Sequence, residues 1–157
     1  LEKINRGLCR IFSSADTDMF ATACYLVADF NDNTMRVACA GHDYPLLAGR
    51  NDGELMGCTE PKGPALGLFS EACYTSSVFD LCDISEALLF TDGVYESANE
   101  KGAEWGRDQF EQSFIAAHSS GAASSVERIS KDAIEWVGGK GFDDDVCLLS
   151  LRIGSAL

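Results

Sequence analysis

The sequence predicts an α+β protein in which two antiparallel β-sheets pack as a sandwich with helices on the outside. Strand-like segments outnumber helix-like segments, and most of them follow one another as hairpins, which is typical of antiparallel sheets. The first hairpin alternates only weakly between apolar and polar residues, as expected where both faces of a sheet are covered. The length of 157 residues fits one domain, so residues 1–157 are expected to form a single domain.

The N-terminal part predicts one helix and then a series of strands. Apolar side chains recur at helical spacing through residues 4–12, which predicts the end of an amphipathic helix. The apolar face of this helix is formed by Ile4, Leu8, Ile11 and Phe12. Residues 19–40 predict a β-hairpin, because two β-rich stretches flank the turn sequence Asn31-Asp32-Asn33. Residues 44–48 predict another strand, which ends before a turn at residues 51–53.

The remaining elements are separated by clear breaks. Residues 59–71 contain too many glycines and prolines for a regular element and predict a loop or lid. After it, strands are expected over residues 74–81, 87–91 and 146–153, and helices over residues 108–118 and 124–137. The second helix has a serine to cap its start and Gly138-Gly139 to end it.

The composition excludes two classes of partner. The formal net charge is −13, from 25 acidic and 12 basic residues, so we expect no binding to nucleic acid, whose phosphates require clustered Lys and Arg. No apolar run reaches about 18 residues, so no membrane insertion is expected. Residues 1–10 lack the apolar core of a signal peptide, which favours a cytoplasmic location. The acidic balance reflects either a solvated surface or a local carboxylate cluster that holds a metal ion.

The seven cysteines show no short Cys-x-x-Cys spacing of a zinc site or redox motif. Cys24, Cys39 and Cys147 lie inside apolar strand segments, where a free thiol behaves as a small hydrophobic residue. We therefore expect the cysteines to be reduced core residues of an intracellular protein.

Acidic residues stand at the ends of two apolar strand segments. Asp92 directly follows the strand predicted over residues 87–91, and Asp143-Asp144-Asp145 directly precedes the strand predicted over residues 146–153. If these strands are antiparallel neighbours, the end of one lies beside the start of the other. Their carboxylates would then converge, and converging carboxylates need a cation such as Mg²⁺ or Mn²⁺ between them.

Each acidic pattern also has an ordinary structural interpretation. An Asp-Gly pair such as Asp92-Gly93 is common in turns, and aspartates before a strand are common in solvated loops. Spacing alone leaves both interpretations open.

The residues around these aspartates resemble a known family. Residues 88–96 (LLFTDGVYE) are similar to the LLxYTDGxxE signature of the SpoIIE/RsbU branch of the PPM phosphatases. Residues 143–149 (DDDVCLL) are similar to that family's closing DDxTLL strand. Further matches occur in the family's order at residues 19–23 (MFATA), residues 40–42 (AGH) with Pro45, residues 63–68 (GPALGL) and residues 105–106 (WG).

The resemblance implies a fold and a reaction. The chain would be the C-terminal portion of a PP2C-like domain, built from two face-to-face antiparallel sheets with helices outside. Such a domain holds two divalent cations, Mn²⁺ or Mg²⁺, at the rim of the sandwich, and a metal-bound hydroxide attacks the phosphorus of a phosphoserine or phosphothreonine in line. No phosphoenzyme forms, so no catalytic residue beyond the metal ligands is expected.

The resemblance also assigns residues to the metal site. Asp92 matches the aspartate of the TDG motif, a direct metal ligand, and Gly93 lets the backbone turn tightly beside the metals. Asp144 matches the closing aspartate. Glu96 matches an acidic position that reaches an additional, weaker cation site, and Asp145 is a weaker, supporting position.

Three other residues are expected to have structural roles or none. Asp143 is an extra aspartate that we expect to be solvated. His42 matches a structural position at a strand end, against the alternative of a general acid. His118, on the apolar side of a helix end, is expected to pack or cap.

The sequence also departs from the family. Full members carry an upstream segment with a bridging aspartate, in wording similar to GGD and GDxxGHG, and this wording does not occur in the 157 residues. The resemblance therefore implies that the chain alone lacks the bridging ligand and is inactive. The family's PGD turn is replaced by Asp83-Ile84-Ser85, and Cys147 stands where a threonine is usual.

Three functional hypotheses remain. The first is a metal-dependent protein serine/threonine phosphatase (a hydrolase) in bacterial signal transduction. Its substrate would be a phosphorylated regulatory protein such as an anti-sigma-factor antagonist in sigma factor regulation, and a sensor domain would lie upstream. The second is a non-catalytic binding or regulatory module that keeps the phosphatase fold. The third is an unrelated acidic β-domain with chance motifs. An upstream aspartate segment distinguishes the first from the second.

Overall fold

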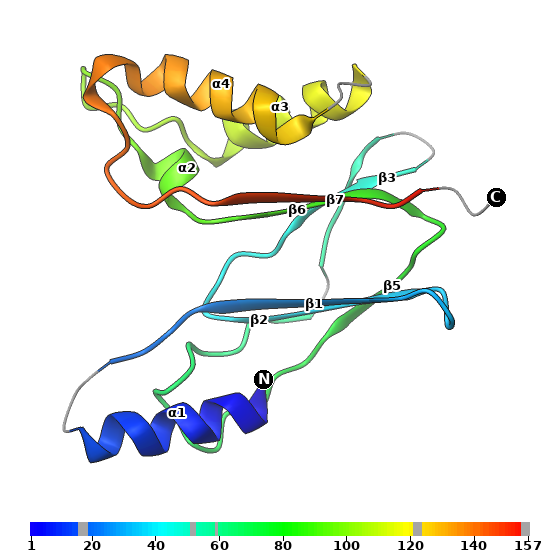
Figure 1. Ribbon diagram of the computed structural model, residues 1–157, viewed down its shortest axis with the longest axis vertical. Helices are drawn as coiled ribbons and strands as arrows, with labels where there is room; N and C mark the ends of the chain where they lie inside the picture. The colour runs from blue at the N-terminus through cyan, green and yellow to red at the C-terminus, as the bar shows by residue number, and fades with distance from the viewer. Residues whose placement is uncertain (16–18, 51–52, 59, 121–123, 155–157) are drawn as a thin grey trace. The chain divides into compact units, whose positions relative to one another are not determined.

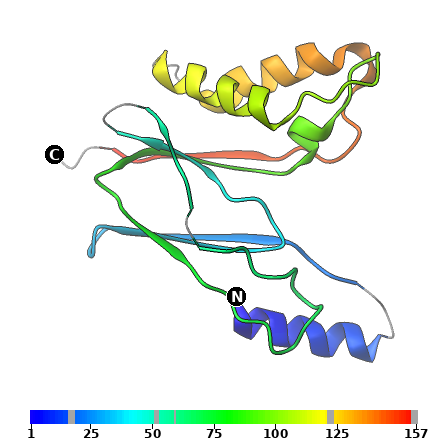
Figure 2. The same cartoon turned by 180° about the vertical axis from the view of Figure 1, so that it is seen from behind.

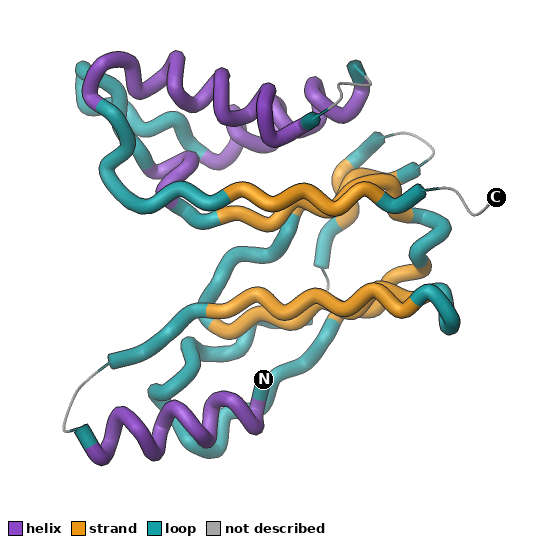
Figure 3. The backbone as a smooth tube through the Cα atoms, in the orientation of Figure 1, coloured by secondary structure: helices purple, strands orange, loops and turns teal. Residues whose placement is uncertain are grey.

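The computed structural model describes residues 1–15, 19–50, 53–58, 60–120 and 124–154. Its elements, of which all but β4 and η1 are labelled in Figure 1, are α1 (Glu2–Ser14), β1 (Ala23–Asp29), β2 (Thr34–Ala40), β3 (Leu46–Gly49), β4 (Leu55–Met56), β5 (Ser77–Asp80), β6 (Ile84–Phe90), α2 (Gly93–Glu96), α3 (Arg107–Ser119), α4 (Ser125–Val137), the 3-10 helix η1 (Gly138–Lys140) and β7 (Leu148–Arg152). Figure 3 shows the same trace coloured by helix, strand and loop. Residues 51 and 52 of the predicted turn and residue 59 of the predicted loop lie outside the described residues.

The chain folds into two compact units, and each contains one antiparallel sheet. The first unit comprises Leu1–Tyr44 and Cys58–Leu81, and its sheet has the strand order β1-β2-β5. The second comprises Pro45–Gly57 and Cys82–Leu157, and its sheet has the order β4-β3-β6-β7. The predicted α+β class with two antiparallel sheets and helices is confirmed. The expectation of a single domain stays a prediction.

The hairpin predicted over residues 19–40 is confirmed, because β1 and β2 pair antiparallel along their whole length. The Asp29 carboxylate accepts hydrogen bonds from the backbone N–H groups of Asn31 (2.9 Å) and Asp32 (3.2 Å). Asn33 completes the turn with a φ of 54°, a left-handed conformation that asparagine tolerates better than most residues.

Helix α1 is confirmed, but its buried side differs from the predicted apolar face. Ile4 and Ile11 are exposed, whereas Asn5 is completely buried. The Asn5 amide group donates to the Phe69 carbonyl oxygen (2.7 Å), and its side-chain oxygen accepts from the Gly67 N–H (2.8 Å). Hydrogen bonds to the loop therefore anchor α1, and helical periodicity of apolar residues does not report such an anchor.

The second unit is organised around β6, which lies between β3 and β7. Strand β6 begins at Ile84, three residues before the predicted start at residue 87, and most of its residues are buried. Its pairing with β7 is antiparallel and places Phe90 opposite Leu148. The neighbouring antiparallel strands on which the site prediction depends are therefore confirmed.

Helices α3 and α4 cover one face of the β4-β3-β6-β7 sheet (Figures 1 and 2). The core between them contains Leu88 and Phe90 from β6, Phe110 and Phe114 from α3, and Ile129 from α4. The start of α4 is capped as predicted, since the Ser124 hydroxyl accepts from the Glu127 N–H (3.2 Å). Gly138, with a φ of 62°, ends α4 as predicted.

All seven cysteines are free thiols, in agreement with the expected reduced state. Cys39 is buried as expected. The expected core position is wrong for Cys73, Cys82 and Cys147, whose side chains are exposed, and β7 begins at Leu148, directly after Cys147. Within the described part of the chain, no helix is long and apolar enough to cross a membrane.

Candidate functional site

The ends of β6 and β7 are held together beyond their last paired residues. The Thr91 N–H donates to the Cys147 carbonyl oxygen (3.1 Å), and the Cys147 N–H donates to the Thr91 hydroxyl oxygen (2.9 Å). The Thr91 hydroxyl in turn donates to the Asp145 carbonyl oxygen (2.8 Å). Asp92, the next residue after Thr91, is therefore brought beside the segment that carries the three aspartates.

Gly93 makes this close approach possible. A Cβ atom at Gly93 would lie 2.8 Å from the Asp145 carbonyl oxygen and 3.2 Å from Asp144 Cβ. Real Cβ atoms do not approach a backbone oxygen that closely, so a larger residue would push the Asp144–Asp145 segment away. Gly93 is needed for contact between two chain segments, and its predicted role in a tight turn beside the metals stays a prediction.

Asp92 and Asp144 both have exposed carboxylates at this junction. One Asp92 carboxylate oxygen accepts from the Gly93 N–H (3.1 Å) and caps the short helix α2. One Asp144 carboxylate oxygen accepts from the Asp145 N–H (2.7 Å). The remaining oxygen of each carboxylate takes part in no hydrogen bond that the structure assigns, so each aspartate keeps a donor atom for a cation.

The other acidic residues at the junction have separate positions. Glu96 is exposed at the end of α2, one turn after Asp92. Asp145 is exposed, and its carbonyl oxygen is used by Thr91. Asp143 is exposed as expected, but it also forms an ion pair with Lys140 (2.7 Å) and accepts from the Ala98 N–H (3.0 Å). The hydrogen bond from Lys140, and then that from the Ala98 backbone, lowers the pKa of Asp143.

The donor chemistry at this junction fits one side of a divalent-cation site. Asp92 and Asp144 offer carboxylate oxygens, the ligands that Mg²⁺ and Mn²⁺ prefer, and Gly93 lets the Asp144–Asp145 segment pack against the turn that carries Asp92. Among the residues that the structure describes, no three His, Cys, Asp or Glu side chains are grouped to hold a metal ion. The metal-ligand roles of these residues stay predictions.

The two histidines lie in different units and have different partners. His42, in the first unit, is half-buried, and its Nδ1 atom lies 2.9 Å from the Asp43 carbonyl oxygen. His118, at the end of α3, is half-buried between Glu86 (3.1 Å) and the Ser85 hydroxyl (3.2 Å). His118 thus has more than the packing or capping role expected from the sequence.

Glu86 is the residue that sequence reasoning missed. It lies in the middle of β6, is completely buried, and binds four side chains from three other elements. These are Ser150 (2.6 Å) and Arg152 (3.6 Å) of β7, Ser125 (3.0 Å) of α4 and His118 (3.1 Å) of α3. Burial alone would raise the pKa of Glu86, but these hydrogen bonds and the Arg152 charge outweigh it and lower the pKa. The available signal was a glutamate directly before the apolar run of residues 87–91.

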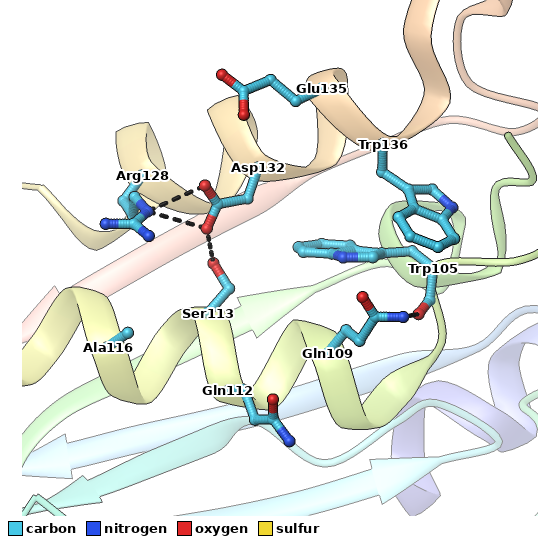
Figure 4. A pocket seen from close by; sticks show the side chains of 9 residues that line it. All are labelled: Trp105, Gln109, Gln112, Ser113, Ala116, Arg128, Asp132, Glu135 and Trp136. Atoms are coloured by element: carbon cyan, nitrogen blue, oxygen red, sulfur yellow. Dashed lines mark hydrogen bonds and ion pairs between the residues drawn. The ribbon is translucent and has the colours of Figure 1, made fainter.

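A cleft of about 510 Å³ lies between α3 and α4 and shares no residue with the aspartate junction. Figure 4 shows its two indole rings, Trp105 and Trp136, and the Asp132 carboxylate between Ser113 and Arg128. Asp132 accepts from the Ser113 hydroxyl (2.7 Å) and forms an ion pair with Arg128 (2.9 Å). The cleft is lined by Trp105, Gln109, Gln112, Ser113, Ala116, Arg128, Asp132, Glu135 and Trp136. Both of its acidic residues are paired with a cation, Asp132 with Arg128 and Glu135 with Lys131 (3.8 Å).

The family described as Stage II sporulation protein E (SpoIIE) matches residues 1–154. The chain belongs to the SpoIIE family. This assignment confirms the resemblance to the SpoIIE/RsbU branch of the PPM phosphatase domains. No curated protein sequence matches the chain significantly.

Solved structures with the fold of this SpoIIE-family chain come from several bacteria. The RsbU and RsbW domains of a Mycobacterium tuberculosis protein are 25% identical with a TM-score of 0.65, over 92% of this chain and 39% of that one. The SiaA-PP2C domain of Pseudomonas aeruginosa is 19% identical with a TM-score of 0.73, over 96% of this chain and 58% of that one. The SpoIIE phosphatase domain of Bacillus subtilis is 13% identical with a TM-score of 0.56, over 87% of this chain and 58% of that one.

These matches define the family and the extent of the likeness. The chain spans between 39% and 58% of the length of these three solved chains. It has the fold of a PP2C-like phosphatase domain and belongs to the SpoIIE family.

Proposed function

We propose that this chain carries one side of the active site of a metal-dependent protein serine/threonine phosphatase. The observation that supports the proposal is the junction of β6 and β7, where Gly93 lets the Asp144–Asp145 segment pack against the turn that presents Asp92. Two exposed carboxylates from distant parts of the sequence are brought to one end of the sheet, and each keeps an oxygen for a cation.

Each residue at the junction has a defined task in this proposal. Asp92 and Asp144 would hold Mn²⁺ or Mg²⁺ through carboxylate oxygens, with Glu96 and Asp145 in weaker, supporting positions. The Thr91 hydroxyl, fixed between Asp145 and Cys147, keeps the two segments in register. When bound, the cations would activate a water molecule and screen the negative charge of the phosphate. The side chains need only hold their geometry, since no nucleophilic Ser or Cys is required.

The substrate class follows from the family. We propose that the target is a phosphoserine or phosphothreonine on a bacterial regulatory protein, such as an anti-sigma-factor antagonist. Phosphoserine as the target residue is supported by solved structures described as bacterial serine phosphatases. We place this action in the cytoplasm, which fits the free state of all seven cysteines.

Metal binding by the junction can be measured through thermal stability. Saturating Mn²⁺ is expected to raise the Tm of the 157-residue chain modestly, because the cation binds the folded state and relieves repulsion between Asp92 and Asp144. Asp92→Asn and Asp144→Asn should each reduce this rise. Asp143→Asn is the matched control and should retain it, because Asp143 is held by Lys140 and Ala98. An unchanged Tm of the unmodified chain in Mn²⁺ would contradict the proposal.

Activity distinguishes an enzyme from a non-catalytic module. The 157 residues contain no GGD-type aspartate, so they should hydrolyse p-nitrophenyl phosphate in Mn²⁺ at or near background. Fusion to the upstream aspartate segment of a SpoIIE-family relative should produce activity that Asp92→Asn abolishes. A fused protein that folds and binds Mn²⁺ but stays inactive would favour a regulatory module. Activity that survives Asp92→Asn would overturn the assigned site.

A further inference from the structure

Two cysteines face each other across the hairpin of the first unit. Cys24 of β1 is the register partner of Cys39 of β2. Cys39 is buried and Cys24 is half-buried, so one thiol of the pair is accessible to a small molecule and the other is shielded. Neither residue belongs to the aspartate junction, so the chemistry of this pair is independent of the proposed phosphatase site.

Backbone hydrogen bonds show whether Cys24 and Cys39 are a hydrogen-bonded or a non-hydrogen-bonded pair of the antiparallel strands. The Cys39 carbonyl oxygen accepts a hydrogen bond from the Gly63 N–H (2.9 Å), and Gly63 is not part of β1. The N–H and C=O groups of a strand residue point to the same side, so those of Cys39 point away from Cys24. Cys24 and Cys39 therefore form a non-hydrogen-bonded pair, in which Cα atoms are about 4.5 Å apart. That spacing lies within the range of about 4.4–6.8 Å that a disulfide spans.

The two thiols differ in their surroundings. The buried Cys39 thiol donates a hydrogen bond to the Asp43 carbonyl oxygen (3.5 Å). Interaction with Cys39 lowers the pKa of Cys24 although burial opposes the shift, whereas interaction with Cys24, together with burial, raises the pKa of Cys39. The more accessible Cys24 is therefore the nucleophilic thiol, and the shielded Cys39 stays protonated.

Cys58 is a third thiol close enough to interact electrostatically with this pair. Burial raises its pKa to about 11, although a hydrogen bond with Ser77 acts in the opposite direction. At neutral pH the Cys58 thiol stays protonated and is a poor nucleophile. Among the described residues, no group of three possible metal ligands is found.

We propose that Cys24 and Cys39 form a reversible cross-strand disulfide when the protein meets hydrogen peroxide. The Cys24 thiolate attacks one peroxide oxygen, the O–O bond breaks, and with one proton this yields a sulfenic acid on Cys24 and water. The Cys39 sulfur then attacks the Cys24 sulfur and displaces its hydroxyl group, which leaves as a second water with the Cys39 proton. The two sulfurs are each oxidised by one electron, and the peroxide is reduced to two molecules of water.

The disulfide would fix the end of the hairpin that carries the loop contact. Gly63 bonds both to Cys39 and to Gly41, so the linked strands hold this part of the loop as well. Thiol-disulfide exchange with a small thiol would restore the reduced pair.

The cleavage sites of trypsin allow a direct test. Cleavage after Arg10, Arg36, Arg50 and Lys62 places Cys24, Cys39 and Cys58 in three separate peptides, residues 11–36, 37–50 and 51–62. The protein is treated with hydrogen peroxide, alkylated and digested without reduction. We expect peptides 11–36 and 37–50 to be joined, with the loss of two hydrogen atoms in mass and full reversal by dithiothreitol. Joining of 11–36 to 51–62 instead, or oxidation of the exposed Cys73, Cys82 and Cys147 while Cys24 and Cys39 remain alkylated, would overturn the proposal.

Variants test which thiol attacks the peroxide and which one then closes the disulfide. Cys58→Ser is the matched control and should form the same link as the unmodified protein. Cys39→Ser should lose the link and accumulate a sulfenic acid on Cys24 that dimedone captures. If Cys39→Ser does not fold, dimedone added to the unmodified protein during oxidation should reduce the link and label Cys24. Labelling of Cys39 in place of Cys24 would contradict the assigned order of attack.

Discussion

At the scale of single residues, Glu86 stands out in the second unit because its carboxylate is completely buried. A buried carboxylate costs several kcal/mol unless charged and hydrogen-bonding groups surround it. Ser150 and Arg152 from β7, Ser125 from α4 and His118 from α3 together meet this requirement. Glu86 therefore ties the central strand to its neighbour and to both covering helices.

The charge of Glu86 should make stability depend on pH. Its folded-state pKa is lowered below the ordinary value of 4.5, so its stabilising effect is present above about pH 4.5 and is lost as pH falls through the folded-state pKa. Glu86→Gln should lower the free energy of unfolding at neutral pH by about 1–3 kcal/mol, because the hydrogen bonds that Ser125, Ser150 and His118 make to the buried carboxylate are weakened or lost. Urea titrations at several pH values measure both effects.

The exposed Glu104 supplies the comparison for that series. Glu104→Gln should change the free energy of unfolding by less than about 0.5 kcal/mol. The difference in the free energy of unfolding between Glu86→Gln and the unmodified chain should become smaller as the pH falls. A difference that stays constant from neutral to strongly acidic pH would mean that Glu86 is not ionised in the folded chain.

At the scale of elements, the turn from β6 into α2 and the segment before β7 fit together through Gly93. Gly93→Ala should destabilise the chain by about 1–3 kcal/mol, because its Cβ would meet the Asp145 carbonyl oxygen at 2.8 Å. Gly57→Ala is the control, since no atom lies within 4 Å of an added Cβ there and its φ is not left-handed. Denaturant unfolding compares the two. Equal stability of both variants would show that the acidic segment does not pack on Gly93.

The same elements show what the sequence could predict. Strands β6 and β7 and helices α3 and α4 were predictable because each has a long apolar run or stripe of its own. Strand β4, of two residues, and α2, of four, are too short for any periodicity. The anchoring of α1 by Asn5 and the partners of Glu86 depend on residues more than 30 positions away. Such contacts leave no local pattern, whereas the family motif around Asp92 indicated the aspartate junction directly.

At the scale of the whole molecule, the net charge of −13 opposes folding through repulsion between acidic groups. Raising NaCl from low to physiological concentration should raise Tm, since the Debye length falls to about 8–10 Å and screens this repulsion. Choline chloride should act equally, because screening depends on ionic strength and not on the identity of the cation. A Tm that falls with salt would instead mean that ion pairs such as Arg107–Glu111 dominate.

The two units are interleaved along the chain, and this order matters while the protein is being synthesised. The segment Pro45–Gly57 leaves the ribosome before Cys58–Leu81, yet its strand β3 must wait for β6 to pair with it. All four residues of β3 are buried in the folded chain. During that interval β3 can pair with β4 along one edge, but the edge that pairs with β6 in the folded chain stays open, and an apolar strand with an open edge associates readily with other nascent chains. Slow translation between residues 58 and 90 would therefore lengthen the period in which aggregation or chaperone capture competes with folding.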